Sequence, residues 1–211
     1  MEQMTNVSMR HAIPDLAMLG SVEDVKRNSQ ALAILDAVLM PEWQYRYFLF
    51  NSRWDQSAGE MMASMRSGSG DEYFILFAPS GAIGKAAVLE DLVDNPATIS
   101  TRIPQCFGSF TSEPAFRLSS VSYCFWCISP GSVWRSEPAE RKTFPLLQFL
   151  VGGPEYYLKW ARQYYETDID IGAVTHVFAE LSVDEGVLMA LNQDVVLESL
   201  HEDLHEIIGG P

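Results

Sequence analysis

After Arg162 the chain contains no lysine and no arginine. Eleven of its 28 Asp and Glu residues lie between positions 166 and 211, whereas all 14 Lys and Arg residues come earlier. Most of the formal net charge of −14 therefore falls on the C-terminal segment. Such a surface repels nucleic acid and anionic lipid and attracts basic surfaces. We expect a basic protein as the partner, with no binding to nucleic acid or to membranes.

Cysteine is also scarce. The chain has only Cys106, Cys124 and Cys127. Three cysteines are too few for the disulfide framework of a small secreted protein, and an odd number cannot all pair within one chain. Cys124 and Cys127 have the spacing of a redox pair, but residues 121–128 predict a strand, in which residues three apart face opposite sides. We therefore expect buried structural thiols in a reduced, cytoplasmic protein.

Long apolar runs are missing as well. The most apolar early stretch, residues 31–40, is interrupted by Asp36 and falls short of the roughly 20 apolar residues that a membrane-spanning helix needs. The N-terminus lacks a basic segment followed by an apolar one, so we expect no secretory signal. A hydrophobic content of 47% suffices for a packed core. We expect one domain over residues 1–211, with residues 1–20 partly mobile.

The pattern of apolar and turn residues predicts an α+β fold. Its parts are an antiparallel sheet built from central hairpins, an N-terminal helix and a helical, acidic C-terminal region over residues 154–211. Ser21 is expected to cap the N-terminal helix over 22–40, and Pro41 to end it. The expected strands cover residues 45–50, 73–77, 82–89 and 122–128, the last followed by a turn at Pro130-Gly131.

Four further helices are predicted. A short one covers residues 60–65, and a longer one 154–165. A capping box at Ser182-Val183-Asp184-Glu185 is expected to open a helix ending at Leu191. The last helix is predicted over 195–208 and stopped by the glycines that follow it.

The segment His201-Glu202-Asp203-Leu204-His205 matches the zinc-hydrolase pattern H-E-x-x-H. In that pattern two histidines one helical turn apart bind zinc and the glutamate activates water. At 100° per residue, however, Glu202 lies nearly opposite the apolar face of the predicted helix. An upstream residue such as His176 or Asp170 would also have to supply the third ligand. A solvent-exposed helix face is the simpler interpretation; His201 and His205 as zinc ligands, with Glu202 as base, are the alternative.

Residues 73–93 resemble a phosphate loop in outline, with a strand, Gly84-Lys85 and then a potential helix from Ala86. Pro79 stands where the first glycine should be, and Ala86 replaces the Ser or Thr that would hold Mg²⁺. A hairpin turning at residues 79–81 is therefore the preferred interpretation. We expect neither a cofactor nor a metal.

Two stretches carry a resemblance to known sequences. The first is Y-R-Y-F-L-F-N-S-R-W at 45–54, continued by E-M-M-A-S-M-R at 60–66 and G-S-G-D-E-Y-F-I-L-F at 68–77. The second contains E-P-A-F at 113–116 and C-F-W at 124–126. Together they resemble an uncharacterised family of small bacterial cytosolic proteins. That family has Lys-Gly-Phe and an acidic residue after the hairpin, where this chain has Gly84-Lys85-Ala86-Ala87, and the resemblance implies no catalytic residue.

A looser likeness, in size, acidity and α+β character, is to immunity proteins that neutralise toxins. With the acidic C-terminal region it favours a non-catalytic binding protein of inhibitor type, whose basic partner would be a toxin. The zinc-dependent hydrolase is the alternative. The expected contact residues are carboxylates of the predicted C-terminal helices: Asp184, Glu185, Glu198, Glu202, Asp203 and Glu206.

Overall fold

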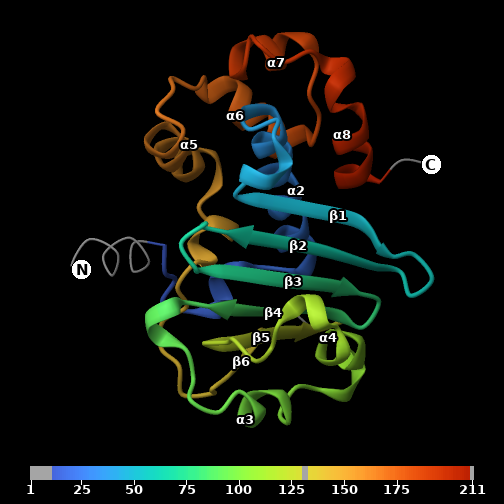
Figure 1. Ribbon diagram of the computed structural model, residues 1–211, viewed down its shortest axis with the longest axis vertical. Helices are drawn as coiled ribbons and strands as arrows, with labels where there is room; N and C mark the ends of the chain where they lie inside the picture. The colour runs from blue at the N-terminus through green and yellow to red at the C-terminus, as the bar shows by residue number, and fades with distance from the viewer. Residues whose placement is uncertain (1–10, 130–132, 210–211) are drawn as a thin grey trace.

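Six antiparallel strands form a meander through the middle of the molecule in the computed structural model, which describes residues 11–129 and 133–209 (Figure 1). Each strand pairs with the one before it, in the order β1-β2-β3-β4-β5-β6. The strands are β1 (Phe48–Asp55), β2 (Glu60–Arg66), β3 (Glu72–Ala78), β4 (Gly81–Ala87), β5 (Tyr123–Ile128) and β6 (Arg135–Glu137). This order confirms the predicted antiparallel sheet built from hairpins.

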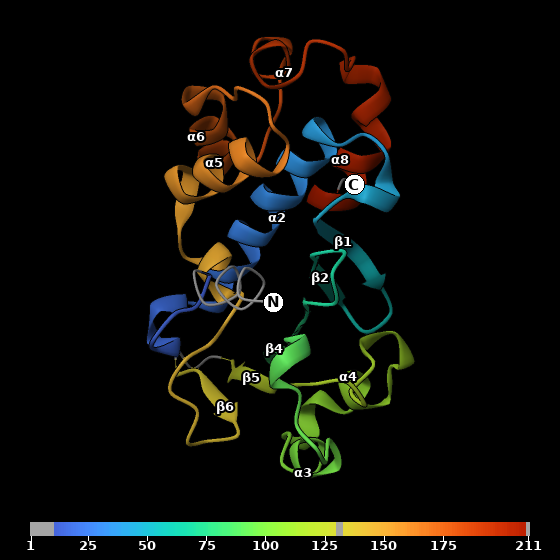
Figure 2. The same ribbon diagram turned by 60° about the vertical axis from the view of Figure 1, so that its left-hand side comes forward.

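The helices fall into two groups on the two sides of the sheet (Figures 1 and 2). The larger group consists of α2 (Val22–Leu39), α5 (Gly153–Tyr164), α6 (Ile171–Glu180), α7 (Glu185–Leu191) and α8 (His201–Ile208). The smaller group, at the opposite end, consists of α3 (Ala97–Ser100) and α4 (Gly108–Ser112). Short 3-10 turns join these elements: η1 (Leu16–Leu19), η2 (Trp43–Tyr45), η3 (Leu89–Asp91), η4 (Gln105–Phe107), η5 (Pro114–Phe116), η6 (Leu147–Leu150) and η7 (Leu197–Leu200). The α+β class is thereby confirmed.

Two apolar cores lie on the two faces of the sheet. The larger core packs α2 and the C-terminal helices against one face, and the smaller core packs α3, α4 and η5 against the other. On β5, Cys124 belongs to the smaller core, whereas Phe125 and Cys127 belong to the larger one. The two cysteines therefore face opposite sides of a strand and are buried, as the sequence predicts.

The N-terminal helix begins where the sequence places it. Ser21 accepts a hydrogen bond from the Asp24 backbone N–H, and the Asp24 side chain accepts one in return from the Ser21 N–H. This reciprocal capping satisfies two N–H groups that have no partner within the helix. The helix ends at Leu39, before Pro41, and is buried almost all round because the sheet, α6 and α8 all contact it.

Residues 60–65 form a strand, so the helix predicted there is wrong. Along β2, Met61, Ala63 and Met65 belong to the larger core and Met62 to the smaller one. Because both faces are covered, the strand contains apolar residues at consecutive positions, and periodicity cannot separate it from a helix. Pairing with β1 and β3 overrides the helical preference of Met, Ala and Glu.

The other boundaries differ by smaller amounts. The first strand begins at Phe48 and runs to Asp55 rather than covering 45–50. The segment after Lys85 continues β4 to Ala87 and then forms the short 3-10 turn η3 rather than an α-helix. This supports the hairpin interpretation. The C-terminal helix α8 begins at His201, because residues 197–200 form η7 instead. The turn predicted at Pro130-Gly131 lies outside the described residues.

The segment before α2 is attached to the rest of the fold wherever the structure describes it. Ile13 pairs with Phe144 in an isolated β-bridge and is fully buried. Leu16 and Leu19 of η1 are buried in the larger core. Residues 1–10 of the stretch predicted to be partly mobile lie outside the described residues. Among the helices that are described, no one is both long and apolar enough to cross a bilayer.

Candidate functional site

The acidic residues of the C-terminal segment gather at one end of the molecule. In both views α6, α7 and α8 lie at the end opposite α3, around one end of α2 (Figures 1 and 2). Asp170 and Asp184 cap α6 and α7: the Asp170 carboxylate accepts a hydrogen bond from the Ala173 N–H, and the Asp184 carboxylate accepts one from the Val187 N–H, each at 2.8 Å. The cap of α7 is thus Asp184 and not Ser182, two residues later than predicted. These aspartates fix helix N-termini as well as adding charge.

Five of the six predicted contact carboxylates are exposed, all except Asp203. Apart from Asp184, which caps α7, and Glu206, which lies beside Asp203, they are Glu185, Glu198 and Glu202. Glu185 is in the first turn of α7, Glu198 in η7 and Glu202 in the first turn of α8. None of the three forms an ion pair with another described residue. Their charge is therefore available to a partner.

Two exposed apolar side chains lie within the same stretch of chain. Met189 is 55% exposed and follows Glu185 by one helical turn, so the two share a face of α7. Val196, just before η7, is 65% exposed. Apolar side chains among charged ones are the usual composition of a protein-binding surface.

Asp203 differs from its neighbours because it binds within the chain. Its two carboxylate oxygens accept hydrogen bonds from the Arg46 guanidinium at 2.6 and 2.8 Å. Arg46 also donates to the carbonyl oxygens of Met40 and Pro41, and its side chain is only 4% exposed. This bidentate pair attaches α8 to the segment between α2 and β1. Sequence spacing gives no sign of it, since the partners are 157 positions apart.

Glu206 lies beside that ion pair. Burial raises the pKa of its carboxyl group, and the neighbouring Asp203 charge raises it further, while Arg46 opposes both. Glu206 is nevertheless exposed, and it lies between two hollows: the cavity that it shares with Arg46 and Asp203, and a shallower one that it shares with Glu202.

The residues of the H-E-x-x-H pattern line a shallow hollow together with Glu206 and Arg53, but their geometry is not that of a metal site. Glu202 is exposed, as its position on the helix predicts. His205 Nε2 lies 2.7 Å from an Arg53 guanidinium nitrogen, so its ring faces a cation. Of the upstream candidates, His176 contacts the Ser182 hydroxyl at 3.2 Å, and Asp170 caps α6. Across residues 11–129 and 133–209, no cluster of three or more His, Cys, Asp or Glu side chains could hold a metal ion.

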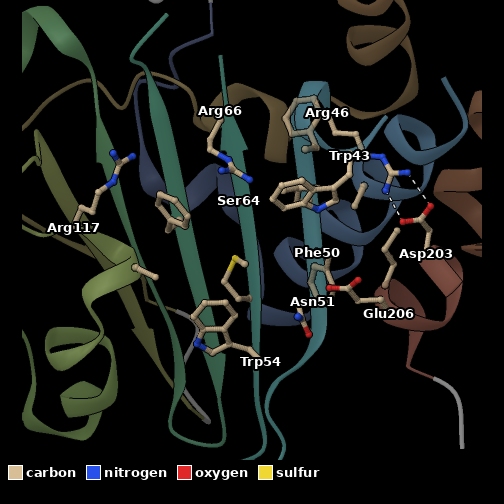
Figure 3. A pocket seen from close by; sticks show the side chains of 17 residues that line it. Trp43, Arg46, Phe50, Asn51, Trp54, Ser64, Arg66, Arg117, Asp203 and Glu206 are labelled. Carbon is tan, nitrogen blue, oxygen red and sulfur yellow. Dashed lines mark hydrogen bonds and ion pairs between the residues drawn. The ribbon is translucent and has the colours of Figure 1, made fainter. Parts of the chain in front are cut away.

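A second candidate site is a groove that the sequence does not predict. The smaller core covers only part of its face of the sheet, and the uncovered part over β1, β2 and β3 is hollowed into a cavity of about 430 Å³. Figure 3 shows this groove between η2 and α8 on one side and the turn that carries Arg117 on the other. Its size is within the range of small-molecule sites.

Aromatic and cationic side chains line the groove together. Trp43 and Trp54 lie along it, and Phe74 forms part of its floor on β3. Arg46, Arg66 and Arg117 supply three guanidinium groups. Alternation along β2 places Ser64 and Arg66 on the same face, toward the groove. Sequence reasoning missed this group because its members come from η2, three strands and the turn after η5, and no spacing in the sequence connects them.

The three cysteines add no further site. Cys106 is exposed, and Cys124 and Cys127 are buried on opposite faces of β5. Burial raises the pKa of the Cys124 thiol to about 12 and raises that of Cys127 as well. A thiol with so high a pKa is a poor nucleophile at neutral pH.

No protein-family model, curated protein or solved structure matched this chain.

Proposed function

We propose that this protein is a non-catalytic binding protein of inhibitor type, which presents its acidic C-terminal helices to a basic protein such as a toxin. The observation that carries the proposal is that Glu185, Glu198 and Glu202 are exposed and form no ion pair with any described residue. They belong to a stretch of sequence that has no Lys or Arg after Arg162. Clustered charge of one sign accelerates encounter with a surface of the opposite sign.

The apolar residues suggest where direct contact occurs. Met189 and Val196 would be covered on binding, and the carboxylates around them would form the charged rim. Asp184, which caps α7, and Asp203, which binds Arg46, contribute charge to this region while stabilising the fold. Glu206 adds charge between Glu202 and the groove.

The proposal is tested by affinity capture from native cell lysate at low and at high salt, with mass-spectrometric identification. We expect a stoichiometric basic protein that is retained at about 0.05 M salt and released at about 0.5 M, where the Debye length falls below about 5 Å. The Glu198→Lys/Glu202→Lys variant should lose most of this binding. A matched double variant, Glu90→Lys/Glu140→Lys, changes the same charge at exposed positions outside the C-terminal region and should retain it.

Capture of the same protein by both variants would contradict the proposal, because the C-terminal carboxylates would then be dispensable. The hydrolase alternative has a separate test in the zinc content of untagged protein. Stoichiometric zinc that is lost in His201→Ala would favour it. No contact among the described residues favours the hydrolase, since His205 faces Arg53 and Glu202 faces solvent.

A further inference from the structure

The groove of Figure 3 contains more cationic groups than its carboxylates neutralise. Arg66 on β2 lies directly opposite Glu72 on β3 in the strand register, the usual position for a cross-strand ion pair. Glu72 is already occupied: Oε1 accepts a hydrogen bond from Lys85 Nζ at 2.8 Å, and Oε2 accepts one from Arg117. Three cations therefore surround one carboxylate, and Arg66 has no ion pair with any residue that the structure describes.

The charge excess lies at one end of the groove. At the other end Asp203 neutralises Arg46, and Glu206 adds a carboxyl group. Lys85 is fully buried, with two backbone carbonyls, of Arg117 and Ser120, as its remaining acceptors. Burial lowers the pKa of Lys85, an effect that its hydrogen bond to Glu72 opposes. Even with Lys85 neutral, Glu72 pairs with Arg117 and leaves Arg66 without an ion pair among the described residues.

An unsatisfied hydroxyl lies beside these cations. Ser64 lines the groove next to Arg66 on β2, is only 2% exposed, and its Oγ has no hydrogen-bond partner. Leaving a buried hydroxyl unsatisfied is unfavourable, and such groups are uncommon in folded proteins. A ligand oxygen in the groove would give this hydroxyl a partner.

Flat apolar surfaces adjoin the same point. Trp43 is 59% exposed, and the Arg66 guanidinium lies over its ring at 5.6 Å from the centroid. Figure 3 places Trp43 and Ser64 on either side of the Arg66 guanidinium, with Trp54 farther along the groove. Phe74, directly opposite Ser64 in the register, supplies a second ring at the floor. Trp43 thus offers an exposed ring, whereas Phe74 is only 8% exposed and has Lys85 Nζ 5.4 Å from its ring centroid. An exposed aromatic ring beside a guanidinium without an ion pair is suited to a flat organic body that carries an anionic group.

We propose that this groove binds a small organic anion. A carboxylate or phosphate group lies against Arg66, Arg117 and the Ser64 hydroxyl, and an aromatic or similarly flat body packs on Trp43 and Phe74. The site is separate from the acidic face, and its test does not depend on the protein partner.

Isothermal titration with four probes tests the site: benzoate, phenyl phosphate, inorganic phosphate and the neutral benzamide. We expect benzoate and phenyl phosphate to bind and to change tryptophan fluorescence. The affinity for benzamide should be lower by about tenfold or more, since a hydrogen bond to a charged group contributes at least that factor in affinity. Comparison of benzoate with phenyl phosphate identifies the preferred head group. Inorganic phosphate shows how much the flat body adds.

Two variants identify the residues. Arg66→Gln should weaken the better anion about tenfold or more, whereas Arg135→Gln, which removes an exposed arginine from β6 outside the groove, should leave the affinity unchanged. Ser64→Ala should weaken binding while the Tm of the ligand-free protein stays the same or rises, because the lost hydroxyl had no partner. A purely structural serine would show the opposite, a lower Tm with unchanged affinity.

Equal affinities for benzoate and benzamide, an unaltered affinity in Arg66→Gln, or no binding of either aromatic anion at about 10 mM would each overturn the proposal.

Discussion

Asp36 of α2 has a fully buried carboxyl group that faces α5 and the start of β1. One of its oxygens accepts hydrogen bonds from the backbone N–H groups of Tyr47 and Phe48 at 2.7 and 2.8 Å, and the other accepts one from the Tyr157 hydroxyl at 3.1 Å. Burial raises its pKa from 3.8 to about 6, although the backbone hydrogen bonds oppose the effect. The charged form is thus disfavoured in the folded protein.

The sign of this effect predicts how stability depends on pH. Between about pH 4 and pH 6 the folded state holds a proton on Asp36 that the unfolded state has lost, so this contribution falls as pH rises. The difference between 3.8 and about 6 corresponds to about 3 kcal/mol. In Asp36→Asn this loss should be absent. Urea unfolding at several pH values measures it, and Asp194→Asn, at an exposed position, is the control. Parallel curves for wild type and Asp36→Asn would refute the prediction.

Glu72 permits a second residue-level prediction. It is the common partner of Lys85 and Arg117, so Glu72→Gln leaves the buried Lys85 ammonium without a counter-charge. We expect the free energy of unfolding to fall by about 3–5 kcal/mol, as for other broken buried pairs. Lys85→Met should be less harmful, because Glu72 keeps Arg117 and the methionine fills a similar volume. Chemical denaturation of the two variants compares them, and equal losses would contradict this ranking.

At the scale of elements, α8 depends on a contact that its own sequence does not contain. Asp203→Asn removes the charge that holds Arg46, and the free energy that keeps α8 docked should fall by about 2 kcal/mol, the value of a hydrogen bond to a charged group. Amide hydrogen exchange over residues 201–208 should become about 30-fold faster.

Glu202→Gln is the matched control for that experiment. It changes the adjacent, exposed carboxylate of the same helix and should leave exchange unaltered. If both variants loosened α8 equally, helix-end charge rather than the ion pair would be the cause.

The elements also show which local sequence patterns suffice to predict secondary structure. Ser21 and Asp24 form their capping box within four residues, and the turn at 79–81 joins β3 to β4 as predicted. β2 was assigned the wrong type, because its alternation is hidden when Met62 faces one core and Met61 the other. The cap of α7 lies two residues after the predicted one, because Ser182 and Asp184 can both serve as caps. The last α-helix begins six residues after its predicted start, since Leu197–Leu200 form η7.

For the whole molecule, a net charge of −14 predicts self-repulsion. In the Glu198→Lys/Glu202→Lys variant, relief of this repulsion is offset by the loss of favourable acidic charge in the first turns of η7 and α8. The free energy of unfolding should therefore change by less than about 1 kcal/mol at low salt, and by less still when salt screens the charges. Thermal or urea unfolding at two salt concentrations measures it.

This stability measurement also supports the binding test. If the variant lost its partner while retaining stability, the carboxylates would act in binding and not in folding. A variant of clearly reduced stability would contradict the expectation that these side chains have no folded-state partner among the described residues.

The sequence by itself determined the α+β class, the capped helix after Ser21, the β3–β4 hairpin and the one-sided distribution of charge. Each depends on residue type and on neighbours a few positions away, where propensity and capping act. The tertiary structure decided that β2 is a strand, that Asp203 binds Arg46, and that Ser64, Arg66 and Trp43 line one groove. These features arise from contacts between segments far apart in the chain, because burial and charge neutralisation depend on neighbours that the sequence order does not reveal.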